Sequence, residues 1–310
     1  MSEFRIGVIG GTGIGGLFGL ETVAGINVID TPFGPTSAPI AEVDWHGTRV
    51  FLLPRHGIGH VLNPSQVPYR ANLFALKKLG VTHILASGAV GSLRQEYAPR
   101  DLVICDQLID KTRRPGTFFD NAAVHVEFAE PFCPVLQKLL ADAAEGGSAK
   151  AHAGGCYVAM EGPAFSTRAE SHMHRLWGGD LIGMTAMPET KLAKEAEIAY
   201  ALVALVTDYD SWKQAPPPAV DVAPEPPGTT AVLDEIIANI QAASANAVTL
   251  IKRAIELAVA EPARLADCPA HRALERAIWS DKSHISRIEV DRLAPLWLKY
   301  LRPPAAPDAG

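Results

Sequence analysis

Long apolar runs are absent from the sequence, and cysteine is scarce. No stretch reaches the roughly 18 apolar residues of a membrane-spanning helix, and the amino terminus lacks the basic lead and cleavage site of a secretory signal. Cys105, Cys133, Cys156 and Cys268 are scattered, without the CxxC spacing of a zinc site or a disulfide framework. We therefore expect a cytoplasmic protein with reduced thiols and no membrane partner.

An excess of positive charge is also missing. The chain has 28 lysines and arginines against 34 aspartates and glutamates, a formal net charge of -6. Proteins whose main task is nucleic-acid binding typically carry a basic surface, so we expect no nucleic-acid partner. A local basic pocket for a small anion such as phosphate remains compatible with this charge.

Short apolar segments bounded by glycine or proline alternate with amphipathic ones. The segments typical of strands are 4–10, 49–54, 81–88, 101–107, 155–160, 180–185 and 199–207, and those typical of helices include 66–80 and 168–179. This alternation predicts an α/β fold with a mostly parallel sheet. The length of 310 residues allows one large domain or two.

The last hundred residues change in character. Residues 213–230 are rich in proline and predict an extended insertion or lid, because proline excludes a regular helix. Residues 229–260 predict one long helix that Thr229 or Thr230 can cap. We expect a main domain over 1–260 and an appended segment over 261–310, with two short helices and a frayed tail.

The first loop is rich in glycine and has more than one interpretation. VIGGTGIGGL contains a GxGxxG pattern from Gly11 to Gly16, and Asp30 follows a second apolar run, as in the dinucleotide fingerprint of an NAD-dependent oxidoreductase. Further glycines such as Gly19 disfavour the helix that this fingerprint needs, at about 1 kcal/mol each relative to alanine. We favour a turn whose amides, with the Thr12 hydroxyl, hold phosphate or a similar anion. From this motif alone, a turn without a ligand is an equally good interpretation.

Two more predicted strand ends offer groups for the same anion. In LPRHGIGH, Arg55 has the planar donor fork that can bind two phosphate oxygens at once. The predicted loop SGAVGS supplies the Ser87 hydroxyl and closely spaced amides at Gly88 and Ala89. Taken alone, Arg55 is better explained by a surface salt bridge.

His56 and His60 are spaced as in some zinc sites. The glycines between them disfavour a helix, and the glutamate of the HExxH motif is absent, so we expect no metal. A hydrogen-bonded structural pair is the simpler interpretation of these two histidines taken alone.

Apolar residues and acids follow the later strands. Phe165 lies in a turn before a capped helix, where it can stack on a planar base, and Met184 can cover a sugar beside Thr185; both apolar residues are more often core residues. In ALVTDYDSW, Asp208 and Asp210 follow a strand and share one face at the sheet edge where ligands of α/β proteins bind.

Together these segments resemble a known family. GGTGIGGL, RHGIGH, NPSQVPYRANLFALKKLG, AVGSL, AEPFCP, EGPAFSTRAES, GMTAMPETKLAKEA and ALVTDYDSW occur in the same order as in the trimeric purine nucleoside phosphorylases. The resemblance covers roughly residues 4–260 and is greatest to the members that act on 5′-deoxy-5′-methylthioadenosine. It implies the purine nucleoside phosphorylase fold, an α/β fold with a distorted mixed β-sheet flanked by helices, rather than a dinucleotide-binding domain.

The resemblance also implies roles for individual residues. The implied phosphate site consists of Thr12, Arg55, His56, Ser87, Ala89 and Thr185. The implied nucleoside site consists of Phe165, Ser166, Met184, Asp208, Asp210, His60 and His125. In this family, a histidine placed like His125 can enter the site of a neighbouring subunit, and the implied assembly is a homotrimer or a dimer of trimers.

The implied reaction is phosphorolysis of 5′-deoxy-5′-methylthioadenosine to adenine and 5-methylthioribose 1-phosphate, in methionine and purine salvage. Inorganic phosphate is the co-substrate, and no cofactor is expected. Asp208 is the candidate acid toward purine N7, and two carboxylates favour the amine of adenine over a 6-oxo purine. Phosphorolysis of methylthioinosine or of purine nucleosides in general is the close alternative, and a scaffold with a decayed site is a weaker one.

The sequence departs from the family pattern at three positions near the implied site. Ala164 stands where an arginine is usual, Gly183 where asparagine is common, and Gly88 where a hydroxyl residue occurs. We expect these changes to loosen substrate choice or to remove phosphate contacts.

Overall fold

The computed structural model describes residues 4–11, 23–213 and 229–301. Its strands are β1 (Ile6–Gly10), β2 (Val23–Asn27), β3 (Ile40–Trp45), β4 (Thr48–Pro54), β5 (His83–Ser92), β6 (Leu102–Ile104), β7 (Gln107–Asp110), β8 (Ala151–Ala153), β9 (Cys156–Ala159), β10 (Leu181–Gly183) and β11 (Ala199–Asp208). Its α-helices are α2 (Tyr69–Lys78), α3 (Pro134–Ala144), α4 (Arg168–Leu176), α5 (Ala186–Glu195), α6 (Thr229–Ala260), α7 (Arg287–Arg292) and α8 (Ala294–Leu301). Short 3₁₀ helices are η2 (Ile58–His60), η3 (Pro262–Leu265), η4 (Pro269–Arg272) and η5 (Lys282–His284).

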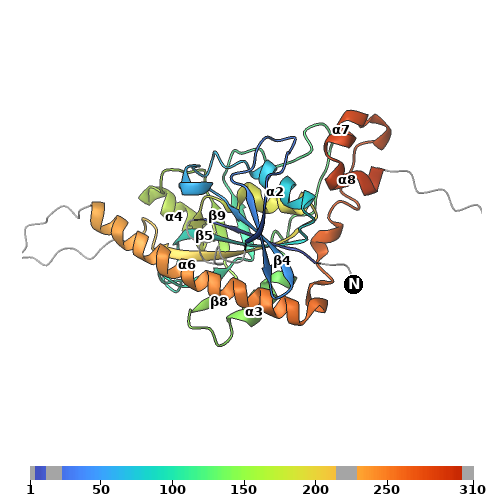
Figure 1. Ribbon diagram of the computed structural model, residues 1–310. Coiled ribbons are helices and arrows are strands. Elements are labelled where there is room, and N and C mark those ends of the chain that lie inside the picture. The colour runs from blue at the N-terminus through green and yellow to red at the C-terminus, as the bar shows by residue number, and fades with distance from the viewer. Residues whose placement is uncertain (1–3, 12–22, 214–228, 302–310) are drawn as a thin grey trace, which may run out of the picture.

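The strands form one mixed sheet flanked by helices (Figure 1). The order along the main path is β2-β3-β4-β1-β5-β10-β9-β7, and β11 connects β5 to β6 and β8. Strands β4, β1, β5 and β11 run parallel, whereas β10 is antiparallel to β5 and β6 is antiparallel to β11. The mixed sheet expected from the resemblance is therefore present.

Residues along β11 alternate between two cores because successive side chains of a strand point to opposite faces. Leu202 and Ala204 pack in the core that α2, α5 and α8 cover. Val203 and Leu205 pack in the core that α3 and α6 cover. Figure 1 shows the long helix α6 crossing one face of the sheet beside α3.

Strand β5 has an uncovered stretch at the centre of the sheet. β11 pairs with one edge of β5 from His83 to Gly91. On the other edge, β1 pairs only with residues 83–86, and β10 pairs only with Gly91 and Ser92. Residues 87–90 therefore have one edge that no described strand covers.

This arrangement corrects the expectation that SGAVGS is a loop. The segment is the second half of β5, because its pairing with β11 keeps it extended despite two glycines. Glycine inside a strand often marks a place where a ligand approaches the main chain closely. The donors expected from a loop come instead from the open edge of a strand.

The described part of the carboxyl-terminal segment packs into the same two cores. Leu274 and Trp297 lie in one of them, and Leu265 and Cys268 lie in the other. The two short helices predicted there are α7 and α8, and the predicted long helix is α6. The proline-rich insertion lies outside the described residues except at its ends.

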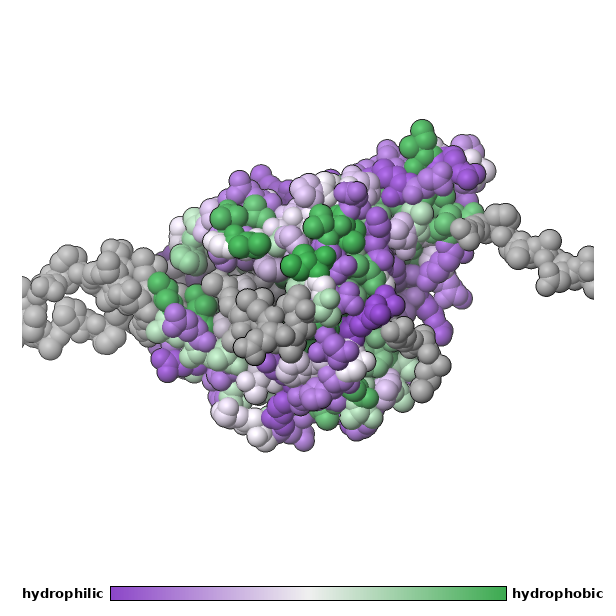
Figure 2. Space-filling view, viewed as in Figure 1, coloured by the Kyte–Doolittle hydropathy of each residue, from purple (hydrophilic) through white to green (hydrophobic). Residues whose placement is uncertain are grey.

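The surface in Figure 2 is largely polar and carries separate apolar patches. The strongly exposed apolar side chains include Ile58, Val61, Phe165 and Trp279. Within the described residues, none of the helices combines the length and the apolar character needed to cross a bilayer.

Candidate active site

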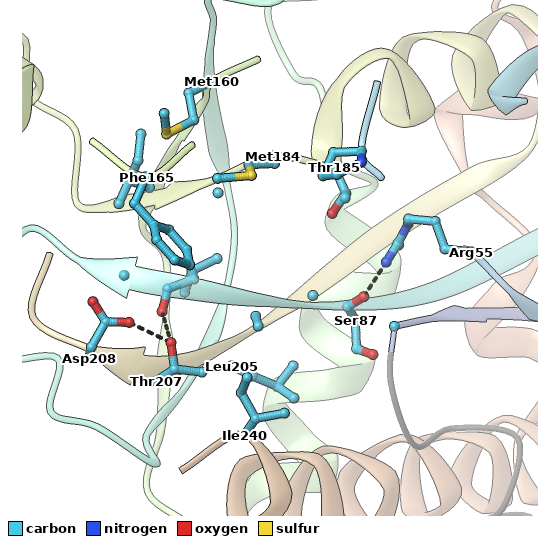
Figure 3. Close-up of a pocket in the computed structure, with 18 of the residues that line it drawn as sticks. Arg55, Ser87, Met160, Phe165, Met184, Thr185, Leu205, Thr207, Asp208 and Ile240 are labelled. Carbon is cyan, nitrogen blue, oxygen red and sulfur yellow. Dashed lines mark hydrogen bonds between the residues drawn. The ribbon is translucent and has the colours of Figure 1, made fainter. Parts of the chain in front are cut away.

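A cavity of about 290 Å³ opens beside the uncovered edge of β5. Figure 3 shows Arg55, Ser87 and Thr185 at one end, Phe165 and Asp208 at the other, and Met184 between them. Groups suited to an anion and groups suited to a heterocycle therefore share one space. A single nucleoside with a phosphate beneath its sugar can bridge the two ends.

Arg55 follows β4 directly and is buried. Its Nε and Nη2 atoms donate to the two carboxylate oxygens of Glu189, each at 2.7 Å, and Nη1 donates to the Ser87 carbonyl at 2.7 Å. Burial by itself would lower the pKa of the Arg55 guanidinium, but the Glu189 carboxylate raises it overall, so the group stays charged. The fork expected to grip two phosphate oxygens is thus occupied by Glu189, and the remaining N–H groups are left for an anion.

The main chain of β5 supplies a further donor at this end. The Ser87 carbonyl points across the open edge to Arg55. Because main-chain groups along a strand alternate between its edges, the Ala89 amide points to the same side. The Val90 carbonyl points the other way, toward β11, and lies 3.1 Å from the Thr207 hydroxyl oxygen.

Gly88 and Thr185 face each other in this part of the cavity. A Cβ placed on Gly88 would lie 3.3 Å from Thr185 Oγ1 and 4.0 Å from Arg55 Nη1. Thr185 immediately precedes α5, and its side chain makes no capping bond to that helix. The hydroxyl of Thr185 therefore stands beside the Arg55 guanidinium, where it can serve an anion.

His56 is buried next to Arg55, and its Nδ1 lies 2.8 Å from the Leu62 carbonyl. Since a carbonyl only accepts, we assign the ring proton to Nδ1, which leaves Nε2 as an acceptor. Burial, with a smaller effect from Arg55, lowers the pKa of His56 to about 4. His56 is therefore neutral at physiological pH, and the ring of His60 stacks on it at a centroid distance of 4.2 Å.

Two carboxylates line the opposite end of the cavity. Asp208 ends β11 after an irregularity in the pairing with β5, and its Oδ1 accepts a hydrogen bond from the Thr207 hydroxyl at 2.6 Å. Asp210 lies in the following turn and is buried, and its Oδ2 has no hydrogen-bond partner within the described part of the chain. A buried oxygen without a donor is costly, so a ligand that brings an N–H group to Asp210 would be stabilised.

Phe165 and Ser166 are held in place by the start of α4. Thr167 and Glu170 form a capping box, with the Thr167 amide donating to the Glu170 carboxylate at 2.9 Å and the Glu170 amide donating to the Thr167 hydroxyl at 3.2 Å. Phe165 is 71% exposed, and its ring stands over the cavity in Figure 3. The Ser166 carbonyl accepts a hydrogen bond from Ser211, which joins this segment to the turn that carries Asp210.

Arg114 holds Met184 and is a residue that sequence reasoning missed. Its Nη1 donates to the Met184 carbonyl at 2.6 Å and to the Tyr69 hydroxyl at 3.1 Å, and its Nε donates to the Glu161 carboxylate at 3.0 Å. Glu189 was missed as well. Arg114 is 70 residues from Met184 and Glu189 is 134 from Arg55, so no local pattern indicates either contact.

Two predicted site residues are not seen at the cavity. Thr12 lies outside the described residues, although Gly11 before it lines the cavity. His125 is exposed and does not line the cavity of its own chain. Its amide donates to the Ala277 carbonyl at 2.9 Å, and its ring packs on Trp279 at a centroid distance of 4.7 Å.

One group of side chains within the described residues has ligand atoms close enough for a metal ion, namely His83, Cys268 and His271. These residues do not line the cavity. His83 Nδ1 already bonds the Thr82 hydroxyl at 2.8 Å, and His271 Nε2 bonds the Thr82 carbonyl at 3.1 Å. We assign the group no part in the chemistry of the cavity.

The chain is similar to known proteins in both sequence and fold. The model of the phosphorylase superfamily matches residues 5–256. An S-methyl-5′-thioadenosine phosphorylase from Chloroflexus aurantiacus is 46% identical over 97% of this chain and 99% of its own length. A methylthioadenosine phosphorylase structure from an Antarctic soil metagenomic library is 41% identical, with a TM-score of 0.81 over 96% of this chain and 99% of its own.

A third relative was solved with a ligand. It is a variant of an adenosine/methylthioadenosine phosphorylase from Schistosoma mansoni in complex with methylthioadenosine, 33% identical, with a TM-score of 0.77 over 89% of this chain and 99% of its own. These matches give the chain a phosphorylase fold and not that of a dinucleotide-binding domain. With a family model over most of its length and relatives that align almost end to end, the chain belongs to the phosphorylase superfamily.

Proposed function

We propose that this enzyme catalyses phosphorolysis of 5′-deoxy-5′-methylthioadenosine to adenine and 5-methylthioribose 1-phosphate, in methionine and purine salvage. The observation that carries the proposal is the single cavity with a cationic end at Arg55 and an acidic end at Asp208 and Asp210. The names of the relatives support the same substrate. Inorganic phosphate is the co-substrate, and the proposed chemistry requires no cofactor.

In the proposed reaction, a phosphate oxygen forms a bond to C1′ of the sugar while the bond between C1′ and N9 of the purine breaks. Arg55, the Ala89 amide and Thr185 hold the phosphate and place it against C1′. The electron pair of the broken bond goes to the purine, and Asp208 shares a proton with N7 so that the base does not leave as an anion. Positive charge that develops on the sugar is offset by the phosphate itself.

Recognition of adenine rests on Asp210 and Asp208. The buried Oδ2 of Asp210 lacks a hydrogen-bond donor from the described residues, and the exocyclic amine of adenine would supply one. A 6-oxo purine would instead place an oxygen against a carboxylate, which typically costs about 1–3 kcal/mol for the unpaired groups. Phe165 would stack on the purine, and Met184 would cover the sugar.

The 5′ substituent would meet apolar and aromatic groups. Leu205 and Ile240 form part of the cavity wall, and Figure 3 shows them on the side opposite Met184. His60 also lines the cavity. Such a wall suits a methylthio group better than a charged one.

We further propose a cytoplasmic homotrimer in which His125 of a neighbouring subunit completes the nucleoside site. His125 and Trp279 form an exposed pair away from the cavity of their own chain, and Trp279 is 72% exposed. Exposed apolar surface of this kind is typical of contact regions between proteins. Sedimentation measurements would decide between monomer, trimer and dimer of trimers.

The direct test is an assay of methylthioadenosine, adenosine, methylthioinosine and inosine with and without phosphate. We expect adenine release from methylthioadenosine that depends on phosphate. Release without phosphate would indicate a hydrolase instead. Nucleoside binding without turnover would indicate a decayed site, and faster cleavage of the 6-oxo nucleosides would favour the alternative substrate class.

The role of Asp208 is tested by the Asp208→Asn variant. We expect kcat/KM for methylthioadenosine to fall by roughly 100-fold or more, as for loss of a general acid, and preference to shift toward 6-oxo nucleosides. Asp291→Asn, in an exposed ion pair with Arg287, is the control and should leave activity unchanged. An unaltered ratio of adenine to 6-oxo substrates in Asp208→Asn would remove Asp208 from this role.

A further inference from the structure

The space beside Gly183 is filled by a tyrosine. Gly183 ends β10 and lines the cavity next to Met184 and Thr185. A Cβ built on Gly183 would lie 2.0 Å from the Tyr157 hydroxyl oxygen and 2.4 Å from Cζ of the same ring. No side chain fits there without displacing the tyrosine, so residues 157 and 183 form a sterically coupled pair.

Tyr157 lies on β9, which pairs with β10, and is fully buried. Tyr157 is not among the residues that line the cavity, so its hydroxyl stands behind the cavity wall. The Thr185 amide donates a hydrogen bond to this hydroxyl at 3.2 Å. Burial raises the pKa of the phenol, which therefore stays protonated at physiological pH and keeps both donor and acceptor capacity.

The hydroxyl of Thr185 serves the anion end, as its position beside Gly88 and Arg55 indicates. The residue lies between β10 and α5, in a segment whose Met187 has non-helical backbone angles, so the helix by itself does not fix the position of Thr185. The hydrogen bond from the Thr185 amide to the buried Tyr157 hydroxyl helps to fix this position. Two side chains therefore hold the peptide unit between Met184 and Thr185: Arg114 Nη1 donates to the Met184 carbonyl at 2.6 Å, and the Tyr157 hydroxyl accepts from the Thr185 amide.

We propose that Tyr157 is a positioning residue for phosphate: its hydroxyl, seated where residue 183 would carry a side chain, holds Thr185 so that the threonine hydroxyl faces the anion beside Arg55. This inference rests on the proposed phosphorolysis.

The test compares Tyr157→Phe with the wild-type enzyme. The variant loses only the hydroxyl, and we expect the KM for phosphate to rise about five- to tenfold, the usual effect of one hydrogen bond, with the KM for methylthioadenosine within about twofold of wild type. Tyr97→Phe is the matched control, because Tyr97 is partly buried, donates to the Gly154 carbonyl at 3.3 Å and does not line the cavity. It should change neither KM. An unchanged phosphate KM in Tyr157→Phe, or an equal rise in both KM values, overturns the proposal.

A second pair of variants separates the effect of the Tyr157 hydroxyl on phosphate binding from the steric overlap between residues 157 and 183. Gly183→Ala should lower the melting temperature, because its Cβ overlaps the ring of Tyr157. Tyr157→Val removes that overlap but also a buried ring, so we expect Gly183→Ala to lower the melting temperature little or not at all when it is added to Tyr157→Val, while the KM for phosphate of the double variant stays raised. Recovery of the wild-type phosphate KM in the double variant would overturn the role of the hydroxyl.

The effect of Tyr157 on phosphate binding can also be measured without a nucleoside substrate. Phosphate alone should raise the melting temperature of wild type more than that of Tyr157→Phe, and equal rises would count against the proposal. This measurement needs no turnover. A wild-type enzyme that binds phosphate but does not cleave methylthioadenosine would therefore refute the proposed function while leaving the role of Tyr157 testable.

Discussion

Arg55 illustrates how one residue at the anion end depends on a distant partner. Its charge is buried and is balanced by Glu189, which also accepts a hydrogen bond from the Tyr200 hydroxyl at 2.7 Å. Breaking a buried ion pair by removing one partner is far more costly than losing a pair at the surface. These partners therefore fix the orientation of Arg55, and in the proposed reaction its remaining N–H groups would need no rearrangement to meet phosphate.

Loss of the Glu189 charge in Glu189→Gln should therefore destabilise the folded protein. Thermal and denaturant unfolding without phosphate should show a free energy of unfolding lower by about 3 kcal/mol or more, because Arg55 loses its countercharge. Added phosphate should raise the melting temperature of the variant more than that of wild type, since the anion then supplies the missing negative charge. Equal phosphate effects on the two proteins would contradict this account. Asp291→Asn, which breaks the exposed ion pair with Arg287, is the control variant. Its free energy of unfolding should fall by less than about 1 kcal/mol.

Gly88 yields a prediction of the opposite sign. In Gly88→Ser, a new hydroxyl would reach the space beside Thr185 Oγ1 and Arg55 Nη1. We expect the KM for phosphate to fall about three- to tenfold through one added hydrogen bond, with no change in the KM for the nucleoside. Gly88→Ala adds the same Cβ without the hydroxyl and should give no gain. A similar improvement in both variants would show that the hydroxyl is not the cause.

Among the secondary-structure elements, apolar runs predicted most of the central strands, and amphipathic spacing predicted helices α2, α4 and α6. Periodicity could not predict that β5 continues through SGAVGS, because pairing with β11 outweighs the local preference of glycine. Individual motifs indicated the polar and acidic side chains at both ends of the cavity. They could not indicate the residues that hydrogen-bond to those side chains. Glu189, Arg114 and Tyr157 act through contacts between elements that only the fold brings together.

Arg114 joins the segments that carry Glu161, Met184 and Tyr69. In Arg114→Lys, a single ammonium group cannot replace a planar fork with several partners. We expect kcat/KM for methylthioadenosine to fall at least about tenfold and the free energy of unfolding to fall by about 2–3 kcal/mol, as for loss of hydrogen bonds to a charged group. Arg113→Lys, at the exposed neighbouring residue, should change neither quantity. Steady-state kinetics and urea denaturation would check both expectations.

For the whole molecule, two buried histidines predict how stability depends on pH. Burial lowers the pKa of His56 and of His83 to about 4, against about 6.5 in the unfolded chain. Between these values the unfolded chain binds more protons at these two histidines, so they lower the free energy of unfolding as pH falls from about 6.5 toward 4. Glu195, whose pKa burial raises to about 7, acts in the opposite sense over this range and offsets part of the decrease. The contribution of the two histidines is fully present above about pH 6.5.

Melting temperatures between pH 7.5 and pH 4.5 would test this expectation. Of the two histidines, only His83 lies outside the cavity lining, so His83→Leu leaves the cavity intact. The melting temperature of this variant should depend less steeply on pH than that of wild type. His172→Leu, at an exposed position, should leave the slope unaltered. A wild-type slope in His83→Leu would show that proton uptake by this residue does not drive acid unfolding.

The gap between β1 and β10 has a lasting consequence for how this enzyme can change. In the proposed reaction, part of the contact with phosphate comes from the peptide group of Ala89, which every amino acid except proline would present equally well. Substitutions can therefore reshape the region around the heterocycle, where side chains make the contacts, more freely than they can abolish the grip on phosphate. New activities that arise on this scaffold are expected to keep the same nucleophile and to exchange the leaving group.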